Sequence, residues 1–190
     1  MPTLTGALLD PLLAPAAHPM GPRITYYDDA TGERIEVSTV TLANWAAKTA
    51  NLLRTELGAG PGSRVAVLLP AHWQTAAVLL GLWWIGAEAV LGGGPAETAA
   101  EIALCTPDRL AEADAAVIGG EVAVLSLDPF GKPAADLPIG VTDYATAVRL
   151  HADQVTGEPA PGPALAGWSV EQTLEAARSS AARQHLSGTD

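Results

Sequence analysis

Two adjacent residues, His72 and Trp73, have side chains that could contact a ligand, and their place in the sequence favours such a role. They follow a run of apolar and β-branched residues, Arg64 to Leu69, which predicts a strand buried on both faces and closed by Pro70. Open α/β sheets bind ligands beyond the carboxyl ends of their strands. His72 and Trp73 are therefore candidate ligand or interface residues. The alternative is that His72 only caps the helix that begins here.

Gly92 and Gly93 form a second candidate site, because they open the loop GGGPAE directly after another predicted strand, Glu88 to Leu91. Successive backbone N–H groups in such a loop can surround an anion. The loop does not match the G-x-G-x-x-G pattern of dinucleotide-binding proteins. The simpler interpretation is that the loop uses glycine only for its backbone freedom.

Trp83 and Trp84 are neighbours in a predicted helix, so their side chains point in different directions. At most one of them can face the same neighbour as Leu80. The other meets a different layer or an exposed surface, which makes both candidates for either a core or an interface role.

The remaining chemical patterns argue against familiar catalytic centres. The stretch SLDPFGKP (126–133) imitates a phosphate-binding P-loop, but Ser126 replaces the first glycine and Pro133 removes a hydroxyl and an N–H, so we interpret it as a turn. Cys105 is the single cysteine and is expected to be a small buried residue. No pair of histidines has a metal-binding spacing, so no metal ligand is assigned. The four histidines are His18, His72, His151 and His185.

The composition favours one well-packed domain in a reducing compartment. Of the 190 residues, 48% are hydrophobic and 16% charged, which supplies a core. A net charge of -11 with only 10 Lys and Arg disfavours binding to nucleic acid or anionic membranes. A single cysteine and the lack of a convincing signal peptide predict a cytoplasmic protein. The apolar run from Val65 to Leu91 is divided by Pro70 and polar residues, so no membrane span is expected.

Hydrophobic spacing and capping residues predict the elements that position these side chains. Helices are expected at Thr5–Ala14, Thr39–Leu57 (capped by Ser38), His72–Ile85, Pro107–Ala113, Thr142–Asp153 and Ser169–Gln184. Strands are expected at Arg23–Tyr27, Arg34–Ser38, Arg64–Leu69, Glu88–Leu91, Ala99–Cys105, Ala115–Ile118, Val122–Leu127 and, as a short piece, Ala164–Gly167.

The order of these elements predicts an α/β fold with a mostly parallel sheet, helices on both faces and an N-terminal β-hairpin. We expect a single domain over residues 1–190. It comprises an N-terminal helix and loop (1–22), an α/β core (23–127), and an irregular connection followed by C-terminal helices (128–190).

The segment from Thr25 to Leu91 resembles the N-terminal part of the adenylate-forming enzymes, which include acyl-CoA synthetases, aryl-CoA ligases and the adenylation domains of peptide synthetases. The resemblance lies in the order of TGER in a hairpin, the helix TLANWAAKTANLL, the run LGAGPGSRVAVLLP, a buried helix and GAEAV. It fades after Leu91, where GGGPAE replaces the family's usual Pro- and Asn-containing stretch. His72 stands where many relatives carry Asn.

The tail PALAGWSVEQTLEAARSS resembles the strand and helix that flank the family's phosphate-binding loop. Here Ala166 passes through Gly167 and Trp168 directly into the helix at Ser169, so on this alignment the loop is deleted. Such short strand–helix pairs are also common in unrelated proteins. The family's adenine platform, its ribose-binding Asp and its catalytic Lys match no segment of this chain. We therefore assign no catalytic, cofactor-binding or metal residue and expect no cofactor.

The resemblance implies an ATP-dependent acid–thiol ligase for complete family members, and this chain lacks the motifs for that chemistry. We expect a binding or interaction module without adenylating activity of its own. Its apolar surface would contact a second copy or another protein. The alternative is a subunit of a split acyl-CoA or carboxylate ligase that another chain completes.

Overall fold

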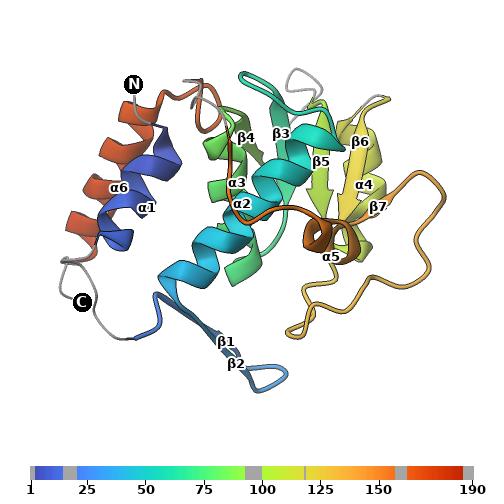
Figure 1. Ribbon diagram of the computed structural model, residues 1–190, viewed down its shortest axis with the longest axis horizontal. Helices are drawn as coiled ribbons and strands as arrows, with labels where there is room; N and C mark the ends of the chain where they lie inside the picture. The colour runs from blue at the N-terminus through green and yellow to red at the C-terminus, as the bar shows by residue number, and fades with distance from the viewer. Residues whose placement is uncertain (1–2, 15–20, 93–99, 118, 157–161, 186–190) are drawn as a thin grey trace.

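A five-stranded parallel sheet forms the centre of the computed structural model, which describes residues 3–14, 21–92, 100–117, 119–156 and 162–185 (Figure 1). The strand order is β4-β3-β5-β6-β7. In register, Val65 of β3 pairs with Ala89 of β4 on one side and with Ile102 of β5 on the other. The strands are β3 (Arg64–Leu68), β4 (Glu88–Leu91), β5 (Ile102–Cys105), β6 (Glu121–Val124) and β7 (Thr142–Asp143).

Helices cover both faces of this sheet. The larger helices are α1 (Leu4–Leu13), α2 (Thr39–Thr55), α3 (Trp73–Trp84), α4 (Leu110–Ala116) and α6 (Val170–Arg183). The short ones are α5 (Tyr144–Ala147) and the 3-10 turns η3 (Pro107–Arg109) and η4 (Val148–Leu150). Helices α2 and α3 pack on one face and α4 on the other. The fold class expected from the sequence is thus confirmed.

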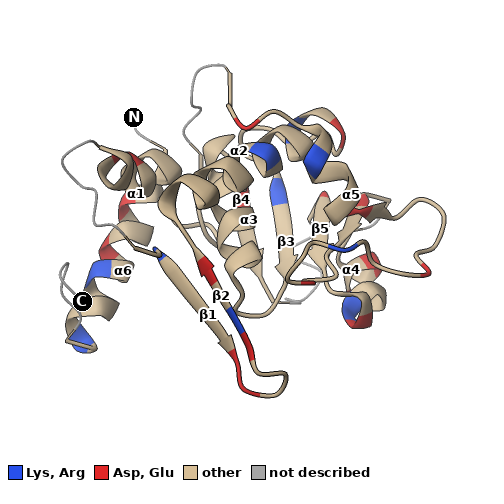
Figure 2. Cartoon of the chain, turned by 60° about the horizontal axis from the view of Figure 1, so that its bottom comes forward, with Lys and Arg blue, Asp and Glu red and all other residues tan. Residues whose placement is uncertain are grey.

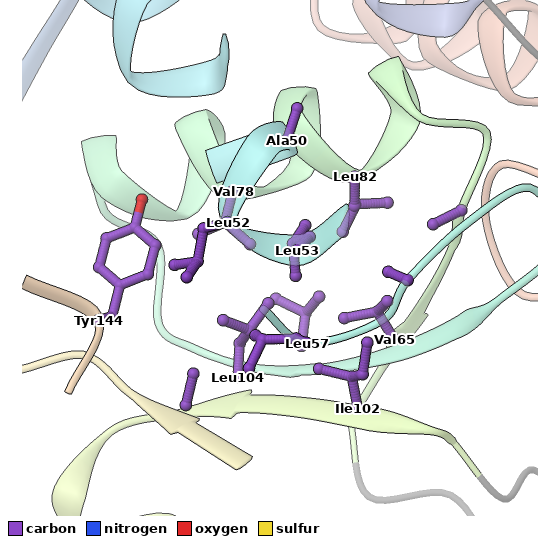
Figure 3. Close-up of a cluster of buried hydrophobic side chains, with 14 of the residues drawn as sticks. Ala50, Leu52, Leu53, Leu57, Val65, Val78, Leu82, Ile102, Leu104 and Tyr144 are labelled. Atoms are coloured by element: carbon purple, nitrogen blue, oxygen red, sulfur yellow. The ribbon is translucent and has the colours of Figure 1, made fainter. Parts of the chain in front are cut away.

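The alternation of residues along β3 explains why its apolar run shows no polar face. Val65 and Val67 enter the core shared with α2 and α3, which Figure 3 shows in close-up. Ala66 and Leu68 enter the core on the opposite face, under α4. Successive strand residues point to opposite sides, so a strand covered on both faces must be apolar throughout. The sequence pattern of this strand therefore predicts its place in the middle of the sheet.

Helices α2 and α3 lie unusually close because Gly81 lacks a side chain. A Cβ atom built there would come 2.8 Å from the Ala46 carbonyl oxygen and 2.8 Å from Thr49 Cβ. Helix α1 packs on the same pair, and the Thr5 hydroxyl donates a 2.5 Å hydrogen bond to the Leu80 carbonyl. Close approach at one glycine fixes the spacing of the layer that covers the sheet.

The antiparallel hairpin of β1 (Ile24–Asp28) and β2 (Glu33–Val37) stands apart from the main sheet. In Figure 1 it lies below the sheet, beyond the carboxyl ends of the strands. Its residues alternate between half-buried and exposed, as expected for a two-stranded ribbon with one covered face. The hairpin was predicted from the turn residues between its strands, and the structure confirms it.

Two elements differ from the sequence-based expectation. The predicted strand Ala115–Ile118 is wrong, because Ala115 and Ala116 continue helix α4; alanine is the strongest helix former. The helix predicted over Thr142–Asp153 is split. Thr142 and Asp143 pair with Ala123 and Val124 as β7, and the helical part starts only at Tyr144. In this second case, pairing with β6 outweighs the helical spacing of apolar residues at Thr142 and Asp143.

Candidate functional site

The candidate site lies beyond the carboxyl end of β3, where the hairpin contacts the start of helix α3. His72 and Trp73 follow β3 there, and α3 begins at Trp73. Both residues are buried, with exposed fractions of 8% and 6%. The sequence predicted these two residues at a strand end, and the structure shows that the hairpin contacts His72 through Tyr26.

His72 caps helix α3, as the alternative interpretation of the sequence predicted. Its Nδ1 atom accepts a 3.2 Å hydrogen bond from the backbone N–H of Gln74. In the neutral ring the proton therefore resides on Nε2, and this buried atom has no hydrogen-bond partner among the described residues. Desolvation lowers the pKa of His72, so the ring is neutral at pH 7. An unpaired buried N–H is the feature that capping alone does not explain.

Aromatic rings surround this corner. The ring of Tyr26, from the hairpin, meets the His72 ring edge-on at 4.5 Å between centroids. Trp73 meets Trp45 of α2 edge-on at 5.4 Å, and Trp45 stacks on Tyr144 at 6.5 Å. The Trp73 indole N–H is also buried without a partner in the part of the chain that the structure describes. Residues from four elements thus form one continuous aromatic cluster.

Tyr144 connects this cluster to the sheet. The residue is completely buried, and its hydroxyl lies 2.6 Å from the Thr49 hydroxyl of α2. Burial raises the pKa of Tyr144 far above its ordinary value, so the phenol stays protonated. Sequence reasoning placed Tyr144 at the start of a helix but gave it no part in an aromatic cluster. The carboxylate of the preceding residue, Asp143, caps this helix by accepting the Thr146 N–H.

The segment after β6 confirms that the P-loop imitation is a turn. One oxygen of the Asp128 carboxylate accepts the backbone N–H groups of Phe130 (2.8 Å) and Lys132 (3.2 Å). The Ser126 hydroxyl donates to the Lys132 carbonyl at 2.6 Å. A phosphate would need these same N–H groups, and an internal carboxylate already takes them. The turn therefore offers no phosphate-binding cradle.

The glycine loop is only partly described. Gly92 ends β4 with a positive φ of 77°, is exposed, and has open space where a side chain would lie. Gly93 falls in the range 93–99, outside the described residues. Its proposed contact with a ligand stays a prediction.

Trp83 and Trp84 are both half-buried. Each packs against the core between the helices and the sheet, and against a second apolar cluster formed by α1, α2, α3 and the hairpin. The Trp83 indole N–H donates a 2.6 Å hydrogen bond to the Ala164 carbonyl. Trp83 therefore holds the C-terminal segment against α3. A contact of either tryptophan with a ligand or partner stays a prediction.

The junction predicted to replace the phosphate loop is a two-residue turn. Leu165 pairs parallel to Ala89 of β4 as a single isolated bridge, so the strand expected over Ala164–Gly167 is reduced to one paired residue. The chain then reverses through Ala166 (φ 46°) and Gly167 (φ 83°), and Trp168 pairs back with Leu165. Positive φ at both central residues is the geometry of a type I′ hairpin turn.

This turn directs α6 away from the candidate site. Because the chain reverses after Ala166, helix α6 starts beside the amino ends of the strands, at the top of the sheet in Figure 1. The carboxylate of Glu88 accepts the Gly167 N–H and lies 3.7 Å from the Arg64 guanidinium. Glu88 is 7% exposed. Sequence reasoning missed it, although a carboxylate inside an apolar strand was a clear signal.

The sequence also predicted no reactive cysteine, no metal site and no membrane-spanning helix. Cys105 is buried in β5, and burial raises the pKa of its thiol to about 11, which keeps it protonated and unreactive at neutral pH. Within the described ranges, no three residues among His, Cys, Asp and Glu gather as metal ligands. No described helix is both long and apolar enough to cross a membrane.

Comparison with known proteins supports the fold and identifies a relative. No known family model matches the sequence. A "TIGR03089 family protein" of Mycobacterium tuberculosis is 68% identical over 192 residues, an alignment covering 99% of this chain and 76% of that protein. Solved structures match at lower identity and share the fold.

Three such structures illustrate the match. The acyl-CoA synthetase of Brucella canis has a TM-score of 0.66 at 20% identity, covering 84% of this chain and 29% of that one. The acetoacetyl-CoA synthetase of Streptomyces lividans has a TM-score of 0.66 at 21% identity, covering 86% and 27%. An anthranilate CoA ligase solved with anthranoyl-AMP has a TM-score of 0.62 at 15% identity, covering 84% and 30%. The chain therefore spans under a third of the length of these enzymes.

Proposed function

Because the chain belongs to the TIGR03089 family and folds as part of an adenylate-forming enzyme, we propose that it is a binding or interaction module that does not adenylate on its own. The adenylating relatives need N–H groups and hydroxyls around the ATP phosphates. Two of the described stretches that could supply such groups already bind internal carboxylates. Asp128 occupies the turn after β6, and Glu88 occupies the turn before α6.

Three exposed apolar side chains in the segment that follows β6 support the interaction role. Phe130, Ile139 and Leu150 have exposed fractions of 82%, 107% and 80%. We call these three residues the post-β6 surface. The Arg149 guanidinium donates to the carbonyls of Phe130 (3.2 Å) and Gly131 (2.6 Å), which joins the Phe130 turn to the helical turn that carries Leu150.

Exposed apolar groups of this size carry the proposal, because they favour contact with a partner over contact with water. Fully burying a large apolar side chain is worth about 1.5–3 kcal/mol. Large apolar side chains and arginine are enriched in protein–protein contacts. The partner is a second copy of the chain or another protein.

The test of the interaction role is the molar mass in solution, measured by light scattering over a range of protein concentrations. The wild type should associate with itself or with a co-purified partner. The variant Phe130→Ser/Ile139→Ser/Leu150→Ser should lose that association while keeping its circular dichroism spectrum. A matched control is Leu8→Ser/Leu13→Ser on α1, which removes two less exposed leucines (37% and 36%) and should leave association unchanged. A wild type that stays monomeric and matches the triple variant in every sample would contradict the proposal.

The test of the missing activity is ATP–pyrophosphate exchange with a panel of carboxylic acids. The chain alone should give no exchange above a protein-free blank. Carboxylate-dependent exchange by the purified chain would overturn the non-catalytic part of the proposal.

The alternative function is that of one part of a split carboxylate–CoA ligase. The observation in its favour is that the fold matches under a third of the length of several CoA ligases. Under this alternative the post-β6 surface would contact the complementary ligase chain. Exchange activity that appears only when both chains are mixed, and disappears with the post-β6 triple variant, would select this alternative.

A further inference from the structure

An open groove follows the exposed side of helix α6 at its beginning. Its lining residues recur at the spacing of one helix face, which places them side by side. They are Trp168, Glu171, Gln172, Glu175 and Ala176. None of the residues of α6 is buried, so this helix leaves a large part of its surface to solvent.

Trp168 is presented on a rigid backbone. Its side chain belongs to a residue that is 47% exposed. Its N–H donates to the Leu165 carbonyl at 2.9 Å, and its own carbonyl accepts the Ala164 N–H at 2.7 Å. The buried carboxylate of Glu88 holds the preceding residue, Gly167. These bonds fix the backbone that carries the indole, which reduces the conformational entropy lost on binding and favours affinity.

Two carboxylates stand beside this indole, one helical turn apart. The Ser169 hydroxyl donates a 2.9 Å hydrogen bond to Glu171 Oε2 and so orients that carboxylate. Hydrogen bonds from its own backbone N–H and from Ser169 lower the pKa of Glu171, which keeps it ionised. None of the ion pairs among described residues involves Glu171 or Glu175. Like charges at this spacing repel each other, and a cation between them would remove that repulsion.

The charges along α6 are unevenly distributed, so the groove lies at the acidic end of the helix. Acidic residues gather near the start of the helix and arginines near its end, as Figure 2 shows. The chain as a whole has a net charge of -11, so the field around it also attracts cations. Tryptophan is the aromatic residue that binds cations best. An arginine side chain can stack on such a ring and donate to two carboxylates at once.

We propose that this groove is a docking site for an arginine side chain of a partner protein, which stacks on Trp168 and pairs with Glu171 and Glu175. The inference rests on the proposed interaction role and names the chemistry of one contact. It uses no residue of the post-β6 surface, so the two can be tested separately.

The test is an NMR titration of the full-length, ¹⁵N-labelled chain with the peptide acetyl-Gly-Arg-Gly-amide. The indole N–H signal of Trp168, assigned by its loss in Trp168→Phe, should shift and saturate. The variant Glu171→Gln/Glu175→Gln should weaken the fitted affinity at least fivefold, because it removes both charges and keeps the side-chain length. Dispersed backbone signals in the same spectra verify that each variant is folded.

Three comparisons decide the outcome. The peptide acetyl-Gly-Gln-Gly-amide should cause no shift, and Glu101→Gln/Glu121→Gln, which removes two exposed carboxylates at the amino ends of β5 and β6, should leave the affinity unchanged. Choline, a small quaternary ammonium ion, should bind more weakly than the arginine peptide. The inference is overturned by the absence of a saturable shift, by equal weakening in both double variants, or by choline binding as well as arginine. Association through the post-β6 surface that survives such a result would leave the proposed function standing.

Discussion

At the scale of single residues, His72 shows how one side chain can serve a structural role and still leave a chemical group unused. Its Nδ1 atom caps α3, and its Nε2 atom is buried beneath the hairpin without a partner among the described residues. The ring faces Tyr26 and Trp73. The charged groups on the covered side of the hairpin are Asp28 and Glu33, which also raise the pKa of Tyr26 after the larger effect of burial.

The lowered pKa of His72 predicts a pH dependence of stability. In the unfolded chain the imidazole takes up a proton near pH 6.5, whereas the folded protein resists this until a lower pH. The unfolded state therefore binds more protons below pH 6.5, and the free energy of unfolding falls as the pH decreases. The slope from one such group is at most about 1.4 kcal/mol per pH unit.

The measurement is urea unfolding at several pH values between 7.5 and 5, for wild type and His72→Asn. Asparagine caps helices well, so the variant keeps the cap and removes the titrating group. The decrease in stability on acidification should be smaller in the variant. Identical pH profiles for the two proteins would show that His72 does not titrate in this range.

At the scale of elements, the contact between α2 and α3 sets the separation of these two helices within the layer that covers the sheet. Gly81 brings α3 against the Ala46 carbonyl and the Thr49 side chain. Thr49 also bonds to Tyr144 and to the Trp45 carbonyl (2.8 Å), so movement of this residue would disturb the aromatic cluster.

The variant Gly81→Ala should be destabilised by roughly 1–3 kcal/mol, because the new methyl group would overpack the helix contact. This loss should exceed the roughly 1 kcal/mol that alanine contributes through its higher helix propensity. Urea unfolding measures the difference. Gly60→Ala is the matched control, since no atom lies within 4 Å of its added methyl group. Equal or greater stability of Gly81→Ala would mean that the helices separate easily.

At the scale of the whole molecule, the sheet core and helix α6 contribute unequally. The cores on the two sheet faces are formed by strands and helices α2, α3 and α4, while α6 contains no buried residue. Figures 1 and 2 both show α6 beside α1, away from the sheet. Residue Glu88 and the short strand at Leu165 attach this helix to the rest of the molecule.

Removal of residues 169–190 should therefore leave a folded protein that unfolds cooperatively. The expected loss is roughly 1–2 kcal/mol, from partial exposure of the surface under Val170 and Leu174. Circular dichroism during urea unfolding measures it. Leu104→Ala in the central core is the comparison, with an expected loss of about 2–5 kcal/mol. A shortened chain without a cooperative transition would show that α6 is part of the folding core.

Much of this architecture could be predicted from the sequence, because the signals are local. The β-branched run at Arg64–Leu68, the caps Ser38 and Ser169, and the spacing of apolar residues in α2 each depend on a few neighbouring residues. The sequence also placed His72 and Trp73 at a strand end, and it identified 126–133 as a turn instead of a P-loop. These inferences needed only the periodicities of helix and strand.

Only the tertiary structure decided how distant segments meet. The burial of His72 under Tyr26, the pairing of β7 with β6, and the carboxylate of Glu88 on Gly167 join residues 46, about 20 and 79 positions apart. No local pattern encodes such contacts, because they depend on chain reversal and on which surfaces remain to be covered. The sequence by itself determined the βαβ framework and its caps. The three-dimensional packing determined which of its polar groups have hydrogen-bond partners and which, among the described residues, have none.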